Sequence, residues 1–277
     1  MTLFSQLHLI RTFRDLHQGG LLLPNAWDAA SARMFEHSGF AAIGTTSAGI
    51  AYTRGRQDGQ TLSRAEMRRE VENIVAAVRV PVNADIEAGY GDSPAEVAQT
   101  VETFAAVGVC GVNLEDATGR ASAPLYALDD QVRRLAAARR AADRAGGLYL
   151  NARTDTYLLG VGATAHDRLE ETLRRGRAFL EAGADSLFVP GLTDLATVRT
   201  LRTELGRPLN LMGGPGAPSV PALHSAGASR VSLGQGVLVA LLGQTARIAR
   251  ELRDTGTYGA LQDEFYGFEA AEALFAR

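Results

Sequence analysis

Two carboxylates stand two positions apart in the stretch "VNADIEAGYGDS", which covers residues 82–93. An apolar, strand-like run leads into Asp85 and Glu87, and glycines follow them. Because alternate residues of a strand point to the same face, we expect both side chains on one side of the strand's carboxyl end. Two like charges so close together need an arginine, a divalent cation or water beside them.

A third carboxylate and an arginine end two later apolar runs. Glu115 closes the run in "GVNLED", and Arg153 closes the run in "LNARTD". If the three carboxylates converge, they form an oxygen-rich site for a hard cation such as Mg2+ or Mn2+. Arg153 can bind a substrate carboxylate through two hydrogen bonds, form a structural ion pair with Asp155 or Glu115, or do both.

Glycine-rich stretches follow two other apolar runs. The stretch "GTTSAGIA", residues 44–51, offers small side chains and free backbone N–H groups, which suit a substrate carboxylate or phosphate. The stretch "MGGPGAPS", residues 212–219, is typical of a tight glycine-proline loop rather than of a phosphate site.

The scaffold that would bring these residues together is visible as a repeat. A helical stretch ends in a small residue and glycine, and a short apolar run with a polar end follows. Eight such runs begin near residues 21, 41, 81, 110, 148, 185, 208 and 230, with helical patterns between them. We therefore predict an α/β protein, a (β/α)8 TIM barrel in one domain over residues 1–277, with additional N-terminal and C-terminal helices. Chemistry in such barrels lies at the carboxyl ends of the strands.

Composition narrows the function classes. The net charge of −3 provides no basic stripe for nucleic acid, and no 18-residue apolar run or signal-peptide core is present. We expect a cytoplasmic protein that acts on a small molecule. All 28 basic residues are arginine, which excludes Schiff-base chemistry on lysine. Cys110 is the single cysteine, and the five histidines lack the spacing of a zinc site.

The combination of "PNAWD", "GTTSAG", "DIEAGYG", "GVNLED" and "LNARTD" resembles the isocitrate lyase and phosphoenolpyruvate mutase superfamily, including its 2-methylisocitrate lyase-like and carboxyphosphonoenolpyruvate phosphonomutase-like members. The resemblance implies that Asp85 ligates Mg2+ directly and that Glu87 and Glu115 hold it through water. It also implies an acidic role for Asp58 in the loop after the second strand. The substrate-binding residues that it implies are Trp27, Thr46, Ser47, Ala48, Asp85, Arg153 and Asn210.

The chain departs from the superfamily in the loop after the fourth strand. The lyases carry a Lys-Lys-Cys-Gly-His run there, whereas this chain reads "EDATGRASAPLYALDD". The phosphonate-processing members use a loop asparagine and a histidine after the sixth strand, where this chain reads "FVPG". We therefore expect neither isocitrate cleavage nor phosphonate chemistry. Cys110 cannot replace the loop cysteine, because it lies inside the fourth strand, where a buried, apolar role is expected.

The remaining chemistry is that of a metal that polarises a 2-oxo acid and stabilises an enolate. We expect an Mg2+-dependent carbon–carbon lyase or decarboxylase for a small 2-oxo or 2-hydroxy dicarboxylate, such as oxaloacetate or a malate derivative. Retro-aldol cleavage would also need an acid and a base, for which Ser122, Tyr126 or a water on Asp58 are candidates. The alternatives are a protein that binds 2-oxoglutarate or oxaloacetate with little turnover, and a class II pyruvate-type aldolase on an unrelated barrel.

The last segment, "YGALQDEFYGFEAAEALFAR", repeats apolar residues at helical spacing after the eighth barrel helix is complete. The resemblance implies that this helix, about residues 257–277, is exchanged between subunits in a homotetramer built as a dimer of dimers. The alternative is that it packs on its own barrel.

Overall fold

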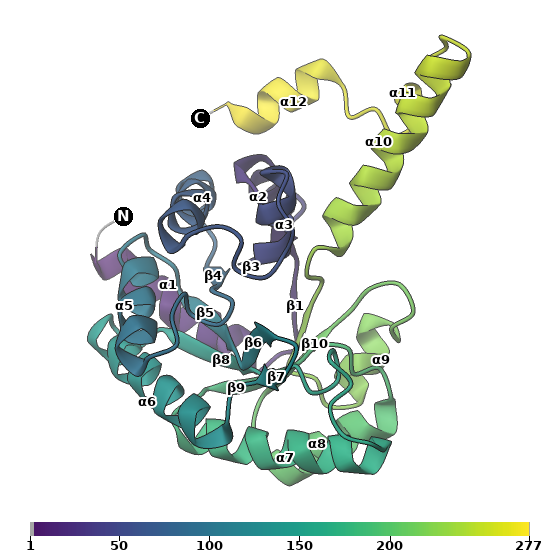
Figure 1. Ribbon diagram of the computed structural model, residues 1–277. Helices are drawn as coiled ribbons and strands as arrows, with labels where there is room; N and C mark the ends of the chain where they lie inside the picture. Colours follow the sequence, from purple (N-terminus) through teal and green to yellow (C-terminus); the bar gives the residue numbers. More distant parts are fainter. Residues whose placement is uncertain (1–2, 277) are drawn as a thin grey trace.

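Short parallel strands form the inner wall of the structure, a computed structural model that describes residues 3–276 (Figure 1). The sheet runs in the order β1-β11-β10-β9-β8-β5-β4-β3-β2. Its strands are β1 (Leu21–Leu23), β2 (Asn25–Ala26), β3 (Ile43–Thr45), β4 (Val82–Asp85), β5 (Gly111–Glu115), β8 (Tyr149–Arg153), β9 (Ser186–Val189), β10 (Leu209–Met212) and β11 (Arg230–Ser232). Each predicted strand begins within two positions of its expected start, and the predicted TIM barrel is confirmed.

The barrel closes at a proline. Pro24 separates β1, which pairs with β11, from β2, which pairs with β3. Asn25 joins the two sides, because its Nδ2 donates to the Thr45 carbonyl at 2.9 Å and its Oδ1 accepts from the Leu233 and Gly234 amides at 2.8 and 3.0 Å. The line between β1 and β2, where the sheet closes into a barrel, is called the seam here. One segment of the chain therefore supplies the strands on both sides of the seam.

Helices surround the strands in the predicted alternation. They are α1 (Leu3–Leu16), α2 (Ala29–His37), α3 (Ser47–Thr53), α4 (Arg64–Ala77), α5 (Pro94–Ala105), α6 (Leu128–Arg144), α7 (Ala165–Glu181), α8 (Leu195–Leu205), α9 (Val220–Ser225), α10 (Gly236–Asp254), α11 (Gly259–Gln262) and α12 (Phe268–Phe275). Local sequence sets their starts: Ser93 caps α5 in a capping box with Glu96, and Pro94 follows at the first helical position. Across residues 3–276, no helix combines the length and apolar character needed to cross a membrane.

The segment after β5 forms a hairpin rather than an open loop. Its strands are β6 (Ala117–Arg120) and β7 (Ala123–Leu125), which pair antiparallel. Cys110, just before β5, is fully buried, and burial raises the pKa of its thiol to about 12. It packs as a small apolar side chain, as expected.

The C-terminal part forms an arm that leaves the barrel and returns to it. Figure 1 shows α10 pointing away from the barrel and α12 folding back toward α2. Arg33 on α2 fastens the end of the arm, since its Nε and NH2 groups donate to the Leu274 carbonyl at 3.2 and 2.6 Å. Within one chain the tail thus lies on its own barrel, and its exchange between subunits stays a prediction.

Candidate active site

A small cavity of about 90 Å3 opens at the carboxyl ends of the strands. It contains most of the residues that the strand-end pattern predicted. The lining residues are Asn25, Thr46, Ser47, Ala48, Asp58, Asp85, Asn113, Arg153, Leu158, Phe188, Pro190, Met212, Ser232, Gly234 and Gln235.

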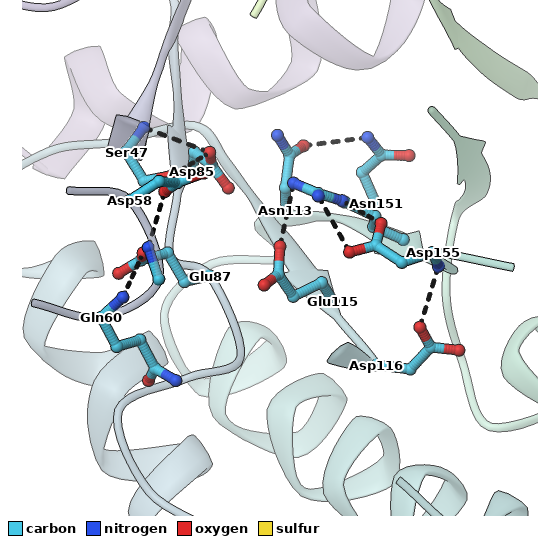
Figure 2. A network of polar contacts seen from close by, with 12 residues as sticks. Ser47, Asp58, Gln60, Asp85, Glu87, Asn113, Glu115, Asp116, Asn151 and Asp155 are labelled. Carbon is cyan, nitrogen blue, oxygen red and sulfur yellow. Dashed lines mark hydrogen bonds and ion pairs between the residues drawn. The ribbon is translucent and has the colours of Figure 1, made fainter. Parts of the chain in front are cut away.

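Asp85 ends β4 at the cavity wall. Its Oδ2 atom accepts hydrogen bonds from the backbone N–H and the hydroxyl of Ser47, at 3.2 and 2.7 Å (Figure 2). Ser47 is placed by the turn before α3, where Thr46 caps the helix by accepting from the Gly49 amide. The Oδ1 atom of Asp85 is buried and has no hydrogen-bond partner within residues 3–276. One oxygen of this carboxylate is therefore available to a ligand.

Glu87 lies two residues further on, behind the cavity wall. Its backbone has φ +50°, a region that residues other than glycine rarely occupy, and such strain often marks functional sites. The Gln60 amide donates to Oε1 at 2.7 Å, whereas Oε2 is buried without a partner in the described part of the chain. Burial raises the pKa of Glu87 to about 7, although the Gln60 amide and the nearby Tyr90 hydroxyl oppose this rise. Glu87 therefore holds a proton easily unless a cation lies beside it.

The loop that carries Asp58 is tied to Glu87 through Gln60. Besides its amide bond to Glu87, Gln60 accepts the Tyr90 N–H through its side-chain Oε1 at 2.9 Å. Asp58 lines the cavity from this loop, and its partial burial and the charge of Asp85 raise its pKa. Gln60 thus connects the loop that carries Asp58 to the carboxylate of Glu87.

Arg153 forms both of the ion pairs that the sequence suggested. It is the register partner of Glu115 on β5, and its NH1 lies 2.9 Å from Glu115 Oε2. Its Nε and NH2 donate to the two oxygens of Asp155 at 2.6 and 2.9 Å. Burial raises the pKa of Glu115, and the Arg153 charge acts against this rise. The two carboxylates fix the guanidinium at the cavity.

Asp116 lies outside the cavity lining and bonds to residues that position Arg153. Its Oδ1 accepts the Asp155 amide at 2.9 Å, and its Oδ2 accepts from Thr154 Oγ1 at 2.8 Å and from Arg175 at 3.2 Å. Burial raises the pKa of Asp116 to about 6, with Arg175 opposing. Asp116 therefore positions Asp155, which in turn positions Arg153.

Besides Glu87 and Glu115, four predicted site residues do not line the cavity. Trp27 packs against Phe35, with ring centroids 6.4 Å apart, and Asn210 is fully buried on β10. Ser122 lies exposed between the hairpin strands β6 and β7, and the Tyr126 hydroxyl donates to Asp92 Oδ1 at 2.5 Å. The structure thus gathers the carboxylates and Arg153 at one place but leaves the hairpin residues outside it.

Asn113, which lines the cavity from the middle of β5, was not among the predicted site residues. A signal for it was present, because several buried strands carry an asparagine where a parallel strand is normally apolar. These asparagines are Asn25, Asn83, Asn113, Asn151 and Asn210.

The carboxylates of Asp85 and Glu87, but not that of Glu115, are suited to bind a hard cation. Residues 3–276 contain no cluster of three or more His, Cys, Asp or Glu side chains arranged to hold a metal ion, and Glu115 is turned toward Arg153. The unpartnered, buried oxygens of Asp85 and Glu87 nevertheless are the oxygen ligands that Mg2+ prefers. Because Mg2+ takes few direct protein ligands and keeps several waters, this donor set fits it.

Comparison with known proteins decides the family. A family model described as phosphoenolpyruvate phosphomutase matches residues 13–253. The chain belongs to this family. Its solved relatives include a candidate lyase or mutase from Burkholderia cenocepacia J2315, with 38% identity, a TM-score of 0.92 and coverage of 99% of this chain and 97% of the other. The resemblance to the isocitrate lyase and phosphoenolpyruvate mutase superfamily is confirmed.

Several curated relatives have named activities, and two of them represent the two activities found. A 2-methylisocitrate lyase from Shewanella oneidensis is 29% identical over 66% of this chain and 62% of its own length. An oxaloacetate decarboxylase from Bradyrhizobium diazoefficiens is 27% identical over 76% of this chain and 72% of its own length. The family thus consists of lyases and mutases that act on carboxylated substrates, and this chain is an enzyme of that superfamily.

Proposed function

We propose that this chain is an Mg2+-dependent carbon–carbon lyase or decarboxylase that acts on a small 2-oxo or 2-hydroxy dicarboxylate such as oxaloacetate. The observation that carries the proposal is the pair of unpartnered carboxylate oxygens on Asp85 and Glu87, in and behind a cavity that also contains Arg153. Buried acceptors without a donor are costly, and a cation held directly by Asp85 and through water by Glu87 would satisfy both. The oxaloacetate decarboxylase among the relatives supports the substrate class.

Asp85 would hold Mg2+ directly, with Glu87 and Glu115 acting mainly through water. When bound, Mg2+ would polarise the 2-oxo group and stabilise the negative charge that develops during bond cleavage. Ser47 would orient Asp85 through its two hydrogen bonds. The cation would then offset the repulsion among the carboxylates of Asp85, Glu87 and Glu115.

Arg153 would bind a substrate carboxylate with the part of its guanidinium that faces the cavity. Asp155 and Glu115 hold the group in place before substrate arrives, so little side-chain entropy is lost on binding. A second substrate carboxylate would lie near Ser47 and Ala48, which also line the cavity. Two anchoring points favour a dicarboxylate over pyruvate.

Asp58 would supply the proton. Breaking the bond to CO2 leaves an electron pair on the substrate as an enolate, whose carbon then needs a proton. Asp58 lines the cavity, and its partial burial and the charge of Asp85 raise its pKa, which favours it as the donor. Ser122 and Tyr126 lie on or beside the hairpin, outside the cavity lining, and are given no part in this step.

Calorimetry with and without Mg2+ tests the proposal. We expect 2-oxoglutarate or oxalate to bind at least about tenfold more tightly with Mg2+ than with EDTA, and Asp85→Ala to abolish the difference. Equal affinity under both conditions would contradict the metal assignment. A parallel assay with oxaloacetate, followed by pyruvate release, separates an enzyme from a protein that only binds 2-oxo acids.

A further inference from the structure

A polar layer crosses the barrel beneath the cavity. Asn83, Asn113 and Asn151 lie on the neighbouring strands β4, β5 and β8, and all three are buried. Asn113 Oδ1 accepts from Asn83 Nδ2 at 3.0 Å and from Asn151 Nδ2 at 2.9 Å. Such a layer is unusual in the core of a parallel barrel, where side chains are mostly branched and apolar, so it calls for an explanation.

Arg230, at the start of β11, extends this layer with a charge. Its side chain is fully buried, and its NH2 group donates to Asn113 Oδ1 at 3.3 Å. Its Nε and NH1 groups have no hydrogen-bond partner in the described residues. Burial lowers the pKa of Arg230 to about 10, which still leaves it charged at neutral pH. A buried cation with so few partners costs stability, so a functional reason for it is needed.

The chemistry of the guanidinium fixes the orientation of Asn113. An asparagine amide has one accepting and one donating end, but a guanidinium can only donate. The atom of Asn113 that faces Arg230 must therefore be the oxygen, and the amide nitrogen must point elsewhere. Asn113 lines the cavity, and its Nδ2 has no acceptor within residues 3–276. In Figure 2 the amide oxygen is turned toward Asn151 and the nitrogen away from it.

We propose that Asn113 donates its amide N–H to an anionic oxygen of the bound 2-oxo acid, and that Arg230 is the positioning residue that holds the amide in this orientation. The inference rests on the proposed function for the identity of the ligand. The donor adds to Arg153 on the next strand, β8, so that the cavity offers two donors from neighbouring strands. Asn113 would thereby contribute to the preference for anionic 2-oxo acids over neutral analogues.

Substitutions at Asn113 test the donor. Asn113→Asp keeps an acceptor for Asn83, Asn151 and Arg230 but replaces the donor by a second oxygen. We expect its affinity for oxalate with Mg2+ to fall at least about tenfold, because a donated hydrogen bond is replaced by repulsion. Asn113→Leu should lose affinity to a smaller extent, since it removes the donor without adding charge. Thermal unfolding of both variants verifies that they are folded.

A double-mutant cycle tests the role of Arg230. Arg230→Met should lower oxalate affinity about three- to tenfold when Asn113 is present and should have no effect in the Asn113→Leu background. Arg230→Lys, which is also a donor only, should restore most of the affinity. A purely electrostatic attraction between Arg230 and the ligand would instead persist in the Asn113→Leu background.

The outcomes separate this inference from the proposed function. If the wild-type protein binds oxalate with Mg2+ but Asn113→Asp binds equally well, the donor role is wrong and the proposed function stands. If Arg230→Met weakens binding equally in both backgrounds, the positioning role is wrong. If the wild-type protein binds neither oxalate nor 2-oxoglutarate, the proposed function fails and this inference fails with it.

Discussion

Arg153 owes its orientation to side chains that do not line the cavity. Asp155 and Glu115 hold the guanidinium, and Asp116 holds Asp155 through its backbone amide. Such a relay restrains Arg153, because Asp116 and Asp155 are buried and each group is bonded to the next. The binding of a substrate carboxylate therefore depends on a set of contacts and not on one charge.

Arg153→Lys is predicted to weaken binding of a 2-oxo dicarboxylate at least about tenfold. A lysine keeps the charge but cannot bond both Asp155 oxygens and Glu115 while also holding a ligand. Calorimetry with 2-oxoglutarate and Mg2+ measures the effect. Arg177→Lys, whose side chain forms an exposed ion pair with Glu204, is the matched control. Unchanged affinity in Arg153→Lys would show that Arg153 only supports the fold.

His17 is predicted to make the protein less stable in acid. It is buried, its Nδ1 donates to the Phe13 carbonyl at 2.8 Å, and its ring stacks on Tyr149 at 4.1 Å. Burial and the charge of Arg230 lower its pKa to about 3. Between that value and the unfolded value of about 6.5 the unfolded chain binds more protons, so stability rises with pH in this window. From pH 7 to pH 5 this residue should cost about 2 kcal/mol.

Urea unfolding at both pH values measures this contribution. In His17→Gln the loss of free energy of unfolding between pH 7 and pH 5 should be smaller by about that amount. His166→Gln, at an exposed position on α7, is the control. An identical loss in His17→Gln and the wild-type protein would contradict the assignment.

At the scale of elements, the hairpin β6–β7 separates this chain from lyases that place acid–base groups after the fourth barrel strand. Residues 117–128 contain no cysteine, histidine or lysine. Tyr126 is engaged with Asp92, and Arg134 lies 3.6 Å from its ring centroid. The hairpin thus occupies the position at which those lyases have a catalytic loop, but it lacks the reactive side chains of that loop.

We therefore predict that the protein does not cleave isocitrate or 2-methylisocitrate at a useful rate. Loss of one positioned acid or base typically costs 10²–10⁴-fold. Glyoxylate or pyruvate release from these substrates is measured against an Asp85→Ala control. Release well above that control would overturn the prediction, and the 2-methylisocitrate lyase among the relatives makes this a demanding test.

The barrel strands and helices were predictable because their signals are local. Glycines after helices, apolar runs and the Ser93-Pro94 cap each depend on neighbouring residues. The split of the first strand at Pro24 depends on pairing with distant residues, and neither this split nor the local β6–β7 hairpin was predicted. The orientation of Asn113 depends on Arg230, 117 positions away. The site was therefore predictable as a set of strand ends, but its internal bonds were not.

At the scale of the whole molecule, the C-terminal arm exposes apolar surface. On α10 the exposed residues are Val239, Leu241, Leu242 and Leu252, and in the tail they are Tyr258, Leu261, Phe265, Tyr266, Phe268 and Phe275. Phe268 is 80% exposed. Many large apolar side chains exposed on one arm are typical of a protein–protein interface.

We predict that the protein forms a homo-oligomer, as a dimer of dimers, through this arm. Light scattering at micromolar concentration should give a mass well above that of the 29.4 kDa chain. The double substitution Leu242→Asp and Phe268→Asp should reduce it, because two charges would be buried in the interface. Arg199→Asp on α8 is the control. A wild-type protein that is only monomeric would contradict the prediction.

The seam at Pro24 has a consequence for how the chain folds. Asn25 bonds to Gly234, which lies 209 positions later, so the barrel cannot close until the last strand has been synthesised. Pairings this distant in sequence slow folding. Until then, β1 and β10 are unpaired edges, which attract other strands. Nascent chains that stop before Arg230 should therefore aggregate or recruit chaperones, whereas chains extended past Gly234 can close their own sheet.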